Sequence, residues 1–179
     1  MNSSEHTKPE RFLARTLFDG TGGPLKKDVL IETDRGRFTK VETYARGQIS
    51  GTIREFDIVG PGLIDIQING AIDVQFNDDP TIDAIKKISV GAAKGGTAWI
   101  LPTYITDFGH NYQKALRAAR DAIERNTPEV LGVHLEGPFL SPRRPGIHPA
   151  AAIRQLSNED MSISSIFPDT EGASIKQCG

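Results

Sequence analysis

The spacing of apolar and polar residues changes character along this chain, near residue 59. From Arg11 to about Ile58 the apolar runs are short and are divided by turns that contain glycine. Short alternating runs with turn residues between them predict a small antiparallel β unit, with 53–58 as its last strand. Beyond residue 59, longer apolar runs alternate with segments of helical spacing, which predicts an α/β region. We therefore expect a β portion at 1–58, an α/β portion at 59–156 and an irregular tail at 157–179.

Strands and helices alternate in the predicted α/β region. A β-branched run at 63–68 is of the kind that is buried on both faces of a parallel sheet. The elements that follow are a helix from Pro80 to Gly95, a strand at 97–101 closed by Pro102, a helix at about 110–125 and a strand at 130–135. This order predicts parallel strands joined by right-handed crossovers. A further helix is expected at 150–156, and His110 is expected to be exposed.

The composition narrows the classes of protein to which the chain can belong. Of its 179 residues, 25% are charged and 37% are apolar, as in soluble globular proteins. The net charge of −2 gives no reason to expect a nucleic acid or an anionic membrane as partner. The only cysteine is Cys178, so neither a disulfide framework nor a thiolate zinc cluster is expected. The polar start and the absence of long apolar runs predict a cytoplasmic protein.

Polar residues gather where the parallel strands are expected to end. Asp65, Gln67 and Asn69 are spaced two apart in the first of these strands, so they share one face. Buried polar groups need partners, and this face is therefore either hydrogen-bonded internally or lines a site. Thr103 and Glu136 fall at the carboxyl ends of the next two strands. Ligands of parallel sheets collect at those ends.

The segment around Glu136 has the composition of a site. His134 and Glu136 are two apart and point to the same side of the predicted third strand. A loop follows that carries His148 together with Arg143 and Arg144, whose charge suits an anionic group. The alternative is that these side chains are merely solvated, as a glutamate at a strand end and a histidine in a loop usually are.

Two segments are specific enough to suggest a family. VGPGLIDIQINGAIDVQF at 59–76 and HLEGPFLSPRRPGIHP at 134–149 resemble segments of the N-acetylglucosamine-6-phosphate deacetylases, members of the amidohydrolase superfamily. The likeness covers roughly residues 10–156. It implies conversion of N-acetylglucosamine 6-phosphate to glucosamine 6-phosphate and acetate in amino-sugar catabolism. It also implies a (β/α)₈ barrel of the TIM type, joined to a small β-sandwich, and a homodimer.

The resemblance also assigns roles to particular residues. Many amidohydrolases have His-x-His at the end of the first barrel strand, whereas deacetylases of this type have Gln-x-Asn and one metal, here Gln67 and Asn69. Glu136 matches the metal-binding glutamate. Ile147 and His148 match the loop that contacts the sugar phosphate, with Gln67 close to the metal. The implied cofactor is one divalent metal, Zn²⁺, which would polarise the amide carbonyl and lower the pKa of an attacking water.

The chain also departs from the family that it resembles. A (β/α)₈ barrel takes about 200 residues or more, and only three of its eight strands are expected here. The family takes two histidine ligands and its acid/base aspartate from later strands, so the catalytic residue is not assigned and both domains are expected to be incomplete. Two alternatives remain: another amidohydrolase that acts on a small amide, and a non-catalytic relic or binding fragment.

Overall fold

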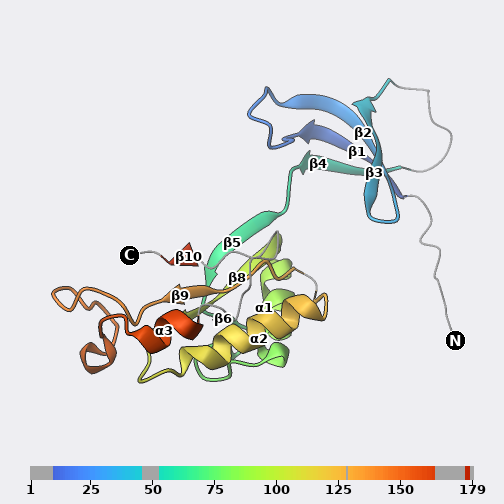
Figure 1. The fold of residues 1–179 in the computed structure, drawn as a ribbon. Helices are drawn as coiled ribbons and strands as arrows, with labels where there is room; N and C mark the ends of the chain where they lie inside the picture. Colours follow the sequence, from blue (N-terminus) through green and yellow to red (C-terminus); the bar gives the residue numbers. More distant parts are fainter. Residues whose placement is uncertain (1–9, 46–52, 128, 164–175, 178–179) are drawn as a thin grey trace, which may run out of the picture. The chain divides into compact units, whose positions relative to one another are not determined.

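The protein divides into two compact units, each with a sheet of its own. The structure, a computed structural model, describes residues 10–45, 53–127, 129–163 and 176–177. The first unit is Met1–Pro61 and the second is Gly62–Gly179. Figure 1 shows a sheet without helices in the first unit, and a sheet with helices packed on it in the second.

The first unit is a four-stranded mixed sheet with the order β3-β2-β1-β4. Its strands are β1 (Glu10–Leu17), β2 (Lys26–Asp34), β3 (Arg37–Thr43) and β4 (Arg54–Val59). The first three are antiparallel, but β4 pairs parallel with β1, so the expectation of an antiparallel unit is wrong for this strand. A hairpin would have set β4 beside β3. The connection after β3 is instead long enough to return the chain to the far side of β1.

The second unit contains a parallel sheet with the order β10-β9-β8-β5. The strands are β5 (Leu63–Ile68), β8 (Thr97–Ile105), β9 (His134–Glu136) and β10 (Lys176–Gln177), and a small hairpin of β6 (Gly70–Ala71) and β7 (Val74–Gln75) follows β5. The expected parallel pairing of the three main strands is confirmed. The segment after residue 157, for which the sequence predicted no element, supplies the short strand β10 at the edge of β9.

Two helices pack on this sheet, as the sequence predicted (Figure 1). Helix α1 (Ile82–Lys94) begins at Thr81, whose hydroxyl accepts a hydrogen bond from the Ala84 amide at 3.2 Å, and it ends at Gly95. Helix α2 spans Tyr112–Glu124. The apolar stripes of both helices meet the sheet in one core, whose largest fully buried members are Phe76, Ile85, Ile88, Ile100, Leu116 and Val133.

Three expected boundaries differ from those in the structure. Strand β8 does not close at Pro102 but continues to Ile105, since proline removes one backbone donor and still adopts an extended conformation. Strand β9 is only three residues long, and Val130 makes an isolated parallel bridge with Ile100. The expected helix at 150–156 is reduced to a 3₁₀ turn, η1 (Ala150–Ala152). A six-residue helix, α3 (Asn158–Ile163), comes after it.

Strand β5 differs most from its sequence-based description. The side chains of Leu63, Ile64 and Ile66 were expected to be buried on both faces, but they are 63%, 57% and 66% exposed. Strand β5 lies at the end of the strand order, and the core cluster that packs on the sheet contacts Ile68 but does not include Leu63, Ile64 or Ile66. Within the described residues, no helix is long and apolar enough to cross a membrane.

Candidate functional site

Glu136 is the centre of the candidate site. It is the last residue of β9 and lies in register with Ile105 of β8, at the carboxyl end of the sheet. Gln67 of β5 donates a hydrogen bond from its Nε2 to Glu136 Oε2 at 3.0 Å, although 69 residues separate the two in sequence. Parallel pairing brings the ends of β5 and β9 to the same edge of the sheet, and this explains the meeting.

The other polar residues of β5 support Gln67 or lie beside it. The Asp65 carboxylate accepts a hydrogen bond from the Gln67 backbone amide at 3.0 Å, which fixes the backbone that carries the Gln67 side chain. Asn69 lies just past the end of β5, and its carbonyl accepts from the Phe76 amide at 2.8 Å. The sequence left two alternatives for this polar face: internal hydrogen bonding, or the lining of a site. Asp65 is hydrogen-bonded internally, whereas Gln67 points toward the carboxylate of Glu136 in β9.

His148 approaches Glu136 from the loop that follows β9. Its Nε2 lies 3.5 Å from Glu136 Oε1, and the two side chains are 9% and 32% exposed. The other ring nitrogen, Nδ1, is buried and has no hydrogen-bond partner among the described residues. A buried polar atom without a partner is destabilising unless a ligand satisfies it. His148 is therefore a candidate ligand-binding side chain on structural grounds.

A glycine allows the loop to leave β9 in this direction. Gly137 has a φ of 95°, and a Cβ on it would collide with the side chain of Thr106. The Thr106 hydroxyl in turn donates a hydrogen bond to the Glu136 carbonyl at 3.2 Å. The backbone of Glu136 is thus held by Ile105, its partner in β8, and by Thr106, the residue after that strand, while its carboxylate contacts Gln67 and His148.

His134 does not join Glu136. Its Nδ1 lies 3.1 Å from the hydroxyl of Thr103, and both side chains are buried. Thr103 and His134 are paired residues of neighbouring strands, so this contact links β8 to β9 below the site. This contact between two buried side chains indicates a structural role for His134.

The exposed part of the loop contains the remaining residues that the sequence singled out. Ile147 is 85% exposed, and the side chains of Arg143 and Arg144 are exposed as well. A turn that begins at Pro145, whose carbonyl accepts from the His148 amide at 3.0 Å, brings His148 inward. The structure therefore joins Gln67, Glu136 and His148, and it does not bring Ile147 to the carboxylate.

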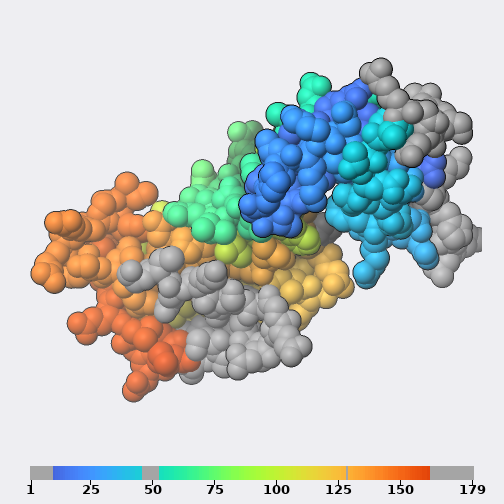
Figure 2. Space-filling view, turned by 90° about the horizontal axis from the view of Figure 1, so that it is seen from above, coloured from blue at the N-terminus to red at the C-terminus, as the bar shows by residue number. Residues whose placement is uncertain are grey.

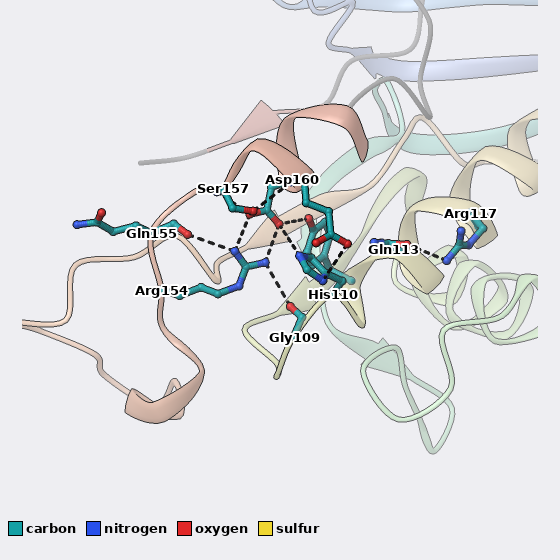
Figure 3. A network of polar contacts seen from close by, with 10 residues as sticks. Gly109, His110, Gln113, Arg117, Arg154, Gln155, Ser157 and Asp160 are labelled. Carbon is teal, nitrogen blue, oxygen red and sulfur yellow. Dashed lines mark hydrogen bonds and ion pairs between the residues drawn. The ribbon is translucent and has the colours of Figure 1, made fainter.

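The sequence did not identify a second polar cluster nearby, around Asp160 (Figure 3). Arg154 forms two hydrogen bonds of 2.6 Å with the two carboxylate oxygens of Asp160. Arg154, followed by Ser157 and Tyr112, holds the pKa of this carboxyl far below its usual range. Burial, with the hydrogen bond to Asp160, raises the pKa of the Tyr112 hydroxyl. A signal was available, because Ser157 and Asp160 have the spacing of a helix capping box.

The donor set at Glu136 fits a divalent cation only in part. No group of three or more histidine, cysteine, aspartate or glutamate side chains in the described part of the chain could hold a metal ion. Glu136 offers carboxylate oxygen, His148 offers imidazole nitrogen, and Gln67 offers an amide next to them. Carboxylate oxygen and imidazole nitrogen suit zinc, whereas an amide is not among its usual ligands, and a catalytic zinc takes about three protein ligands.

Comparisons with known proteins give consistent results. No family model matches the chain. It is 30% identical over 118 residues to the N-acetylglucosamine-6-phosphate deacetylase of Haemophilus influenzae, covering 64% of this chain and 31% of that protein. It is also 36% identical over 99 residues to the N-acetylgalactosamine-6-phosphate deacetylase of a Shewanella strain, covering 55% of this chain and 25% of the relative. The chain thus spans about a third or less of these curated relatives.

Solved structures agree on the fold. The N-acetylglucosamine-6-phosphate deacetylase of Mycobacterium smegmatis matches with a TM-score of 0.74 at 22% identity, covering 87% of this chain and 43% of that one. The corresponding protein of Thermotoga maritima matches with a TM-score of 0.68 at 25% identity, covering 86% and 38%. The mixed α/β fold is shared with these structures, and this chain covers less than half of each.

Proposed function

The chain is related to the N-acetylglucosamine-6-phosphate deacetylases, and from this premise we propose that it is part of a metal-dependent deacetylase of amino-sugar 6-phosphates. The meeting of Gln67, Glu136 and His148 carries the proposal. These three side chains come from separate segments and converge at the end of a parallel sheet where ligands of such sheets bind. We also propose that residues 59–156 form the first part of a (β/α)₈ barrel, with residues 1–58 as part of a small β-sandwich.

The metal is assigned to Glu136. One zinc ion held there, with further ligands from outside this chain, would supply a Lewis acid that polarises the acetamide carbonyl and activates water. Gln67 restrains one carboxylate oxygen through its 3.0 Å hydrogen bond, which leaves Glu136 in a fixed orientation. The deacetylation adds water across the amide C–N bond: the acetyl carbon takes the hydroxyl and the amine nitrogen takes the proton.

His148 and Ile147 are assigned to the substrate. The unpartnered Nδ1 of His148 provides a polar atom that a phosphate oxygen or a sugar hydroxyl can satisfy. Ile147, exposed beside it, provides apolar surface for the sugar. The neighbouring side chains of Arg143 and Arg144 favour an anionic ligand.

Ligand titration of the chain tests this assignment. N-acetylglucosamine 6-phosphate should shift the NMR signals of the Gln67 side-chain amide and the His148 ring, whereas N-acetylglucosamine without phosphate should bind more weakly. The matched control is His148→Gln, which should abolish the difference between the two sugars. An absence of shifts at both residues at millimolar ligand would contradict the assignment, and another small amide substrate would then be the alternative.

The configuration of the sugar is a second question, because one relative is named an N-acetylgalactosamine-6-phosphate deacetylase. Titrating both sugar phosphates in parallel decides between the two, and the tighter binder identifies the substrate class.

Acetate release by the chain alone, compared with the chain plus the remaining segments of a relative, separates an active enzyme from a binding fragment. We also propose that the complete protein is a cytoplasmic homodimer, which sedimentation and fractionation would test.

A further inference from the structure

The loop that carries His148 is closed at its base. The Arg154 backbone amide donates a hydrogen bond to the Pro138 carbonyl at 3.1 Å, so the two ends of the segment 138–154 meet. This neck begins two residues after Glu136. Figure 2 shows the loop in orange as a protrusion of the second unit, next to the red atoms of α3. Its outer part, including Arg143 and Arg144, is exposed.

Arg154 ties the neck to other elements through its side chain (Figure 3). Both terminal nitrogens of the guanidinium donate to Asp160, each at 2.6 Å, and one of them also donates to the Gly109 carbonyl at 3.3 Å. The guanidinium lies over the ring of Phe139, 5.0 Å from its centre. Arg154 therefore holds both sides of the neck, since Phe139 lies at one end of the loop and Arg154 at the other.

Asp160 anchors this arrangement to helix α2. Its side chain is only 1% exposed, and its carboxylate also accepts hydrogen bonds from the Tyr112 hydroxyl at 2.6 Å and from Ser157. The ring of Tyr112 packs edge-on against Phe139, with the ring centres 6.2 Å apart. His110 Nε2 faces the same carboxylate at 3.3 Å. The neck of the loop is thus fixed to the start of α2 by a buried and extensively bonded carboxylate.

We propose that Arg154 and Asp160 are positioning residues that hold the loop 138–154 so that His148 faces Glu136. They do not touch the candidate ligand site themselves. Their effect passes through the neck, because a loop whose two ends are fixed keeps its inward-turned residue in one orientation. The proposal rests on the proposed function only for the identity of the ligand, whereas the positioning itself concerns the ligand-free protein.

The test compares Asp160→Asn with Asp121→Asn in the full chain. The Asp160→Asn change keeps the shape of the side chain but weakens its hold on Arg154, whereas Asp121 pairs with Arg120 on the exposed side of α2 and serves as the matched control. In Asp160→Asn we expect amide exchange of 138–154 to rise at least tenfold and the NOE between the His148 ring and the Glu136 side chain to be lost. The control should change neither.

Binding provides the second measurement. The Asp160→Asn variant should bind N-acetylglucosamine 6-phosphate at least tenfold more weakly than the wild-type chain does. It should still unfold cooperatively. If the wild-type chain binds no sugar phosphate, the proposed function fails, and the NOE and exchange data still decide the positioning role. Unchanged exchange and an unchanged NOE in a folded Asp160→Asn protein would overturn the proposal. Should that variant fail to fold, Arg154→Lys, which keeps the charge and loses the paired hydrogen bonds, is judged by the same two measurements.

Discussion

Two polar clusters in the second unit differ in how far the protein itself satisfies them. In the first cluster, the Glu136 side chain is about a third exposed. The Nδ1 atom of His148 is buried there without a hydrogen-bond partner among the described residues. Around Asp160, the carboxylate is almost fully buried and accepts from Arg154, Tyr112 and Ser157. His110 Nε2 lies 3.3 Å from this carboxylate and is also buried without a hydrogen-bond partner among the described residues. A satisfied buried cluster contributes to stability and specificity, whereas an unsatisfied one is stabilised by what it binds. The two carboxylates, rather than the two histidines, therefore separate a structural network from a candidate ligand site.

The largest effect is expected from breaking the buried ion pair on one side only. Arg154→Met leaves the Asp160 charge buried without its main partner, and we expect a loss of about 3–5 kcal/mol in the free energy of unfolding. Urea denaturation measures it. The double variant Arg154→Met/Asp160→Leu should lose less than the sum of the two single variants, because no charge is left unpaired. Additive losses would contradict a direct coupling.

Acid should weaken the Asp160 cluster specifically. Its pKa is depressed in the folded protein, chiefly by Arg154, below the value of about 3.9 for an unfolded aspartate. The stabilisation is therefore complete above that unfolded value and is lost progressively as the pH falls toward the folded pKa. Unfolding experiments between neutral pH and pH 3 should show a decline that is smaller in Asp160→Asn. Parallel curves for the two proteins would exclude Asp160 as the cause.

A smaller effect is expected from the phenol of Tyr112. Tyr112→Phe removes the donor to Asp160 but keeps the ring that packs on Phe139, so only the hydrogen bond is lost. Hydrogen bonds to charged groups contribute about 1.5–3 kcal/mol, and we expect a loss near the lower limit because other donors remain. Tyr44→Phe, in the first unit, is the control for the chemical change. Equal losses would show that the contact with Asp160 is not responsible.

The smallest effect on stability is expected at the ligand site. Gln67 is exposed, and replacing it with alanine should change the free energy of unfolding by no more than about 0.5 kcal/mol. The same change should weaken ligand binding, because Glu136 loses the hydrogen bond that orients it. Denaturation and sugar-phosphate titration of one preparation measure both quantities. A large loss of stability would place Gln67 in the structural network.

The sequence predicted elements with strong periodicity more accurately than their ends. The apolar stripe of α1, its Thr81 cap and the glycine after it lie close together in the chain, so local rules sufficed. Strand β9 was predicted too long because a run of apolar residues marks burial, and Val130 is buried while making only an isolated bridge. The exposure of Ile66 depends on which elements pack on the faces of β5, and no local pattern records this.

The sequence predicted polar contacts only where they follow from the order of the parallel strands. Strand ends of a parallel sheet gather at one edge, so the sequence indicated that Asn69, Thr103 and Glu136 would lie at the same edge. The nearness of Gln67 to the metal-binding Glu136 was implied by the family resemblance. The contact of Asp160 with Tyr112 spans 48 residues and joins the start of α2 to α3, a helix that the sequence did not predict, so no local pattern indicated it. His110 was expected to be exposed, but it is partly covered where it faces Asp160, and that expectation is wrong for the same reason.

The closed neck of the loop 138–154 also bears on how this protein can vary. Because the Arg154 amide and the Pro138 carbonyl already meet, inserted residues at the tip would lengthen a loop whose ends need no rearrangement. Closure entropy grows slowly with length, by roughly 0.6 kcal/mol for each doubling of a flexible loop. Residues 141–147 are therefore a region where insertions and deletions should be tolerated, so that evolution or an engineer can reshape the rim of the ligand site while the base stays constant.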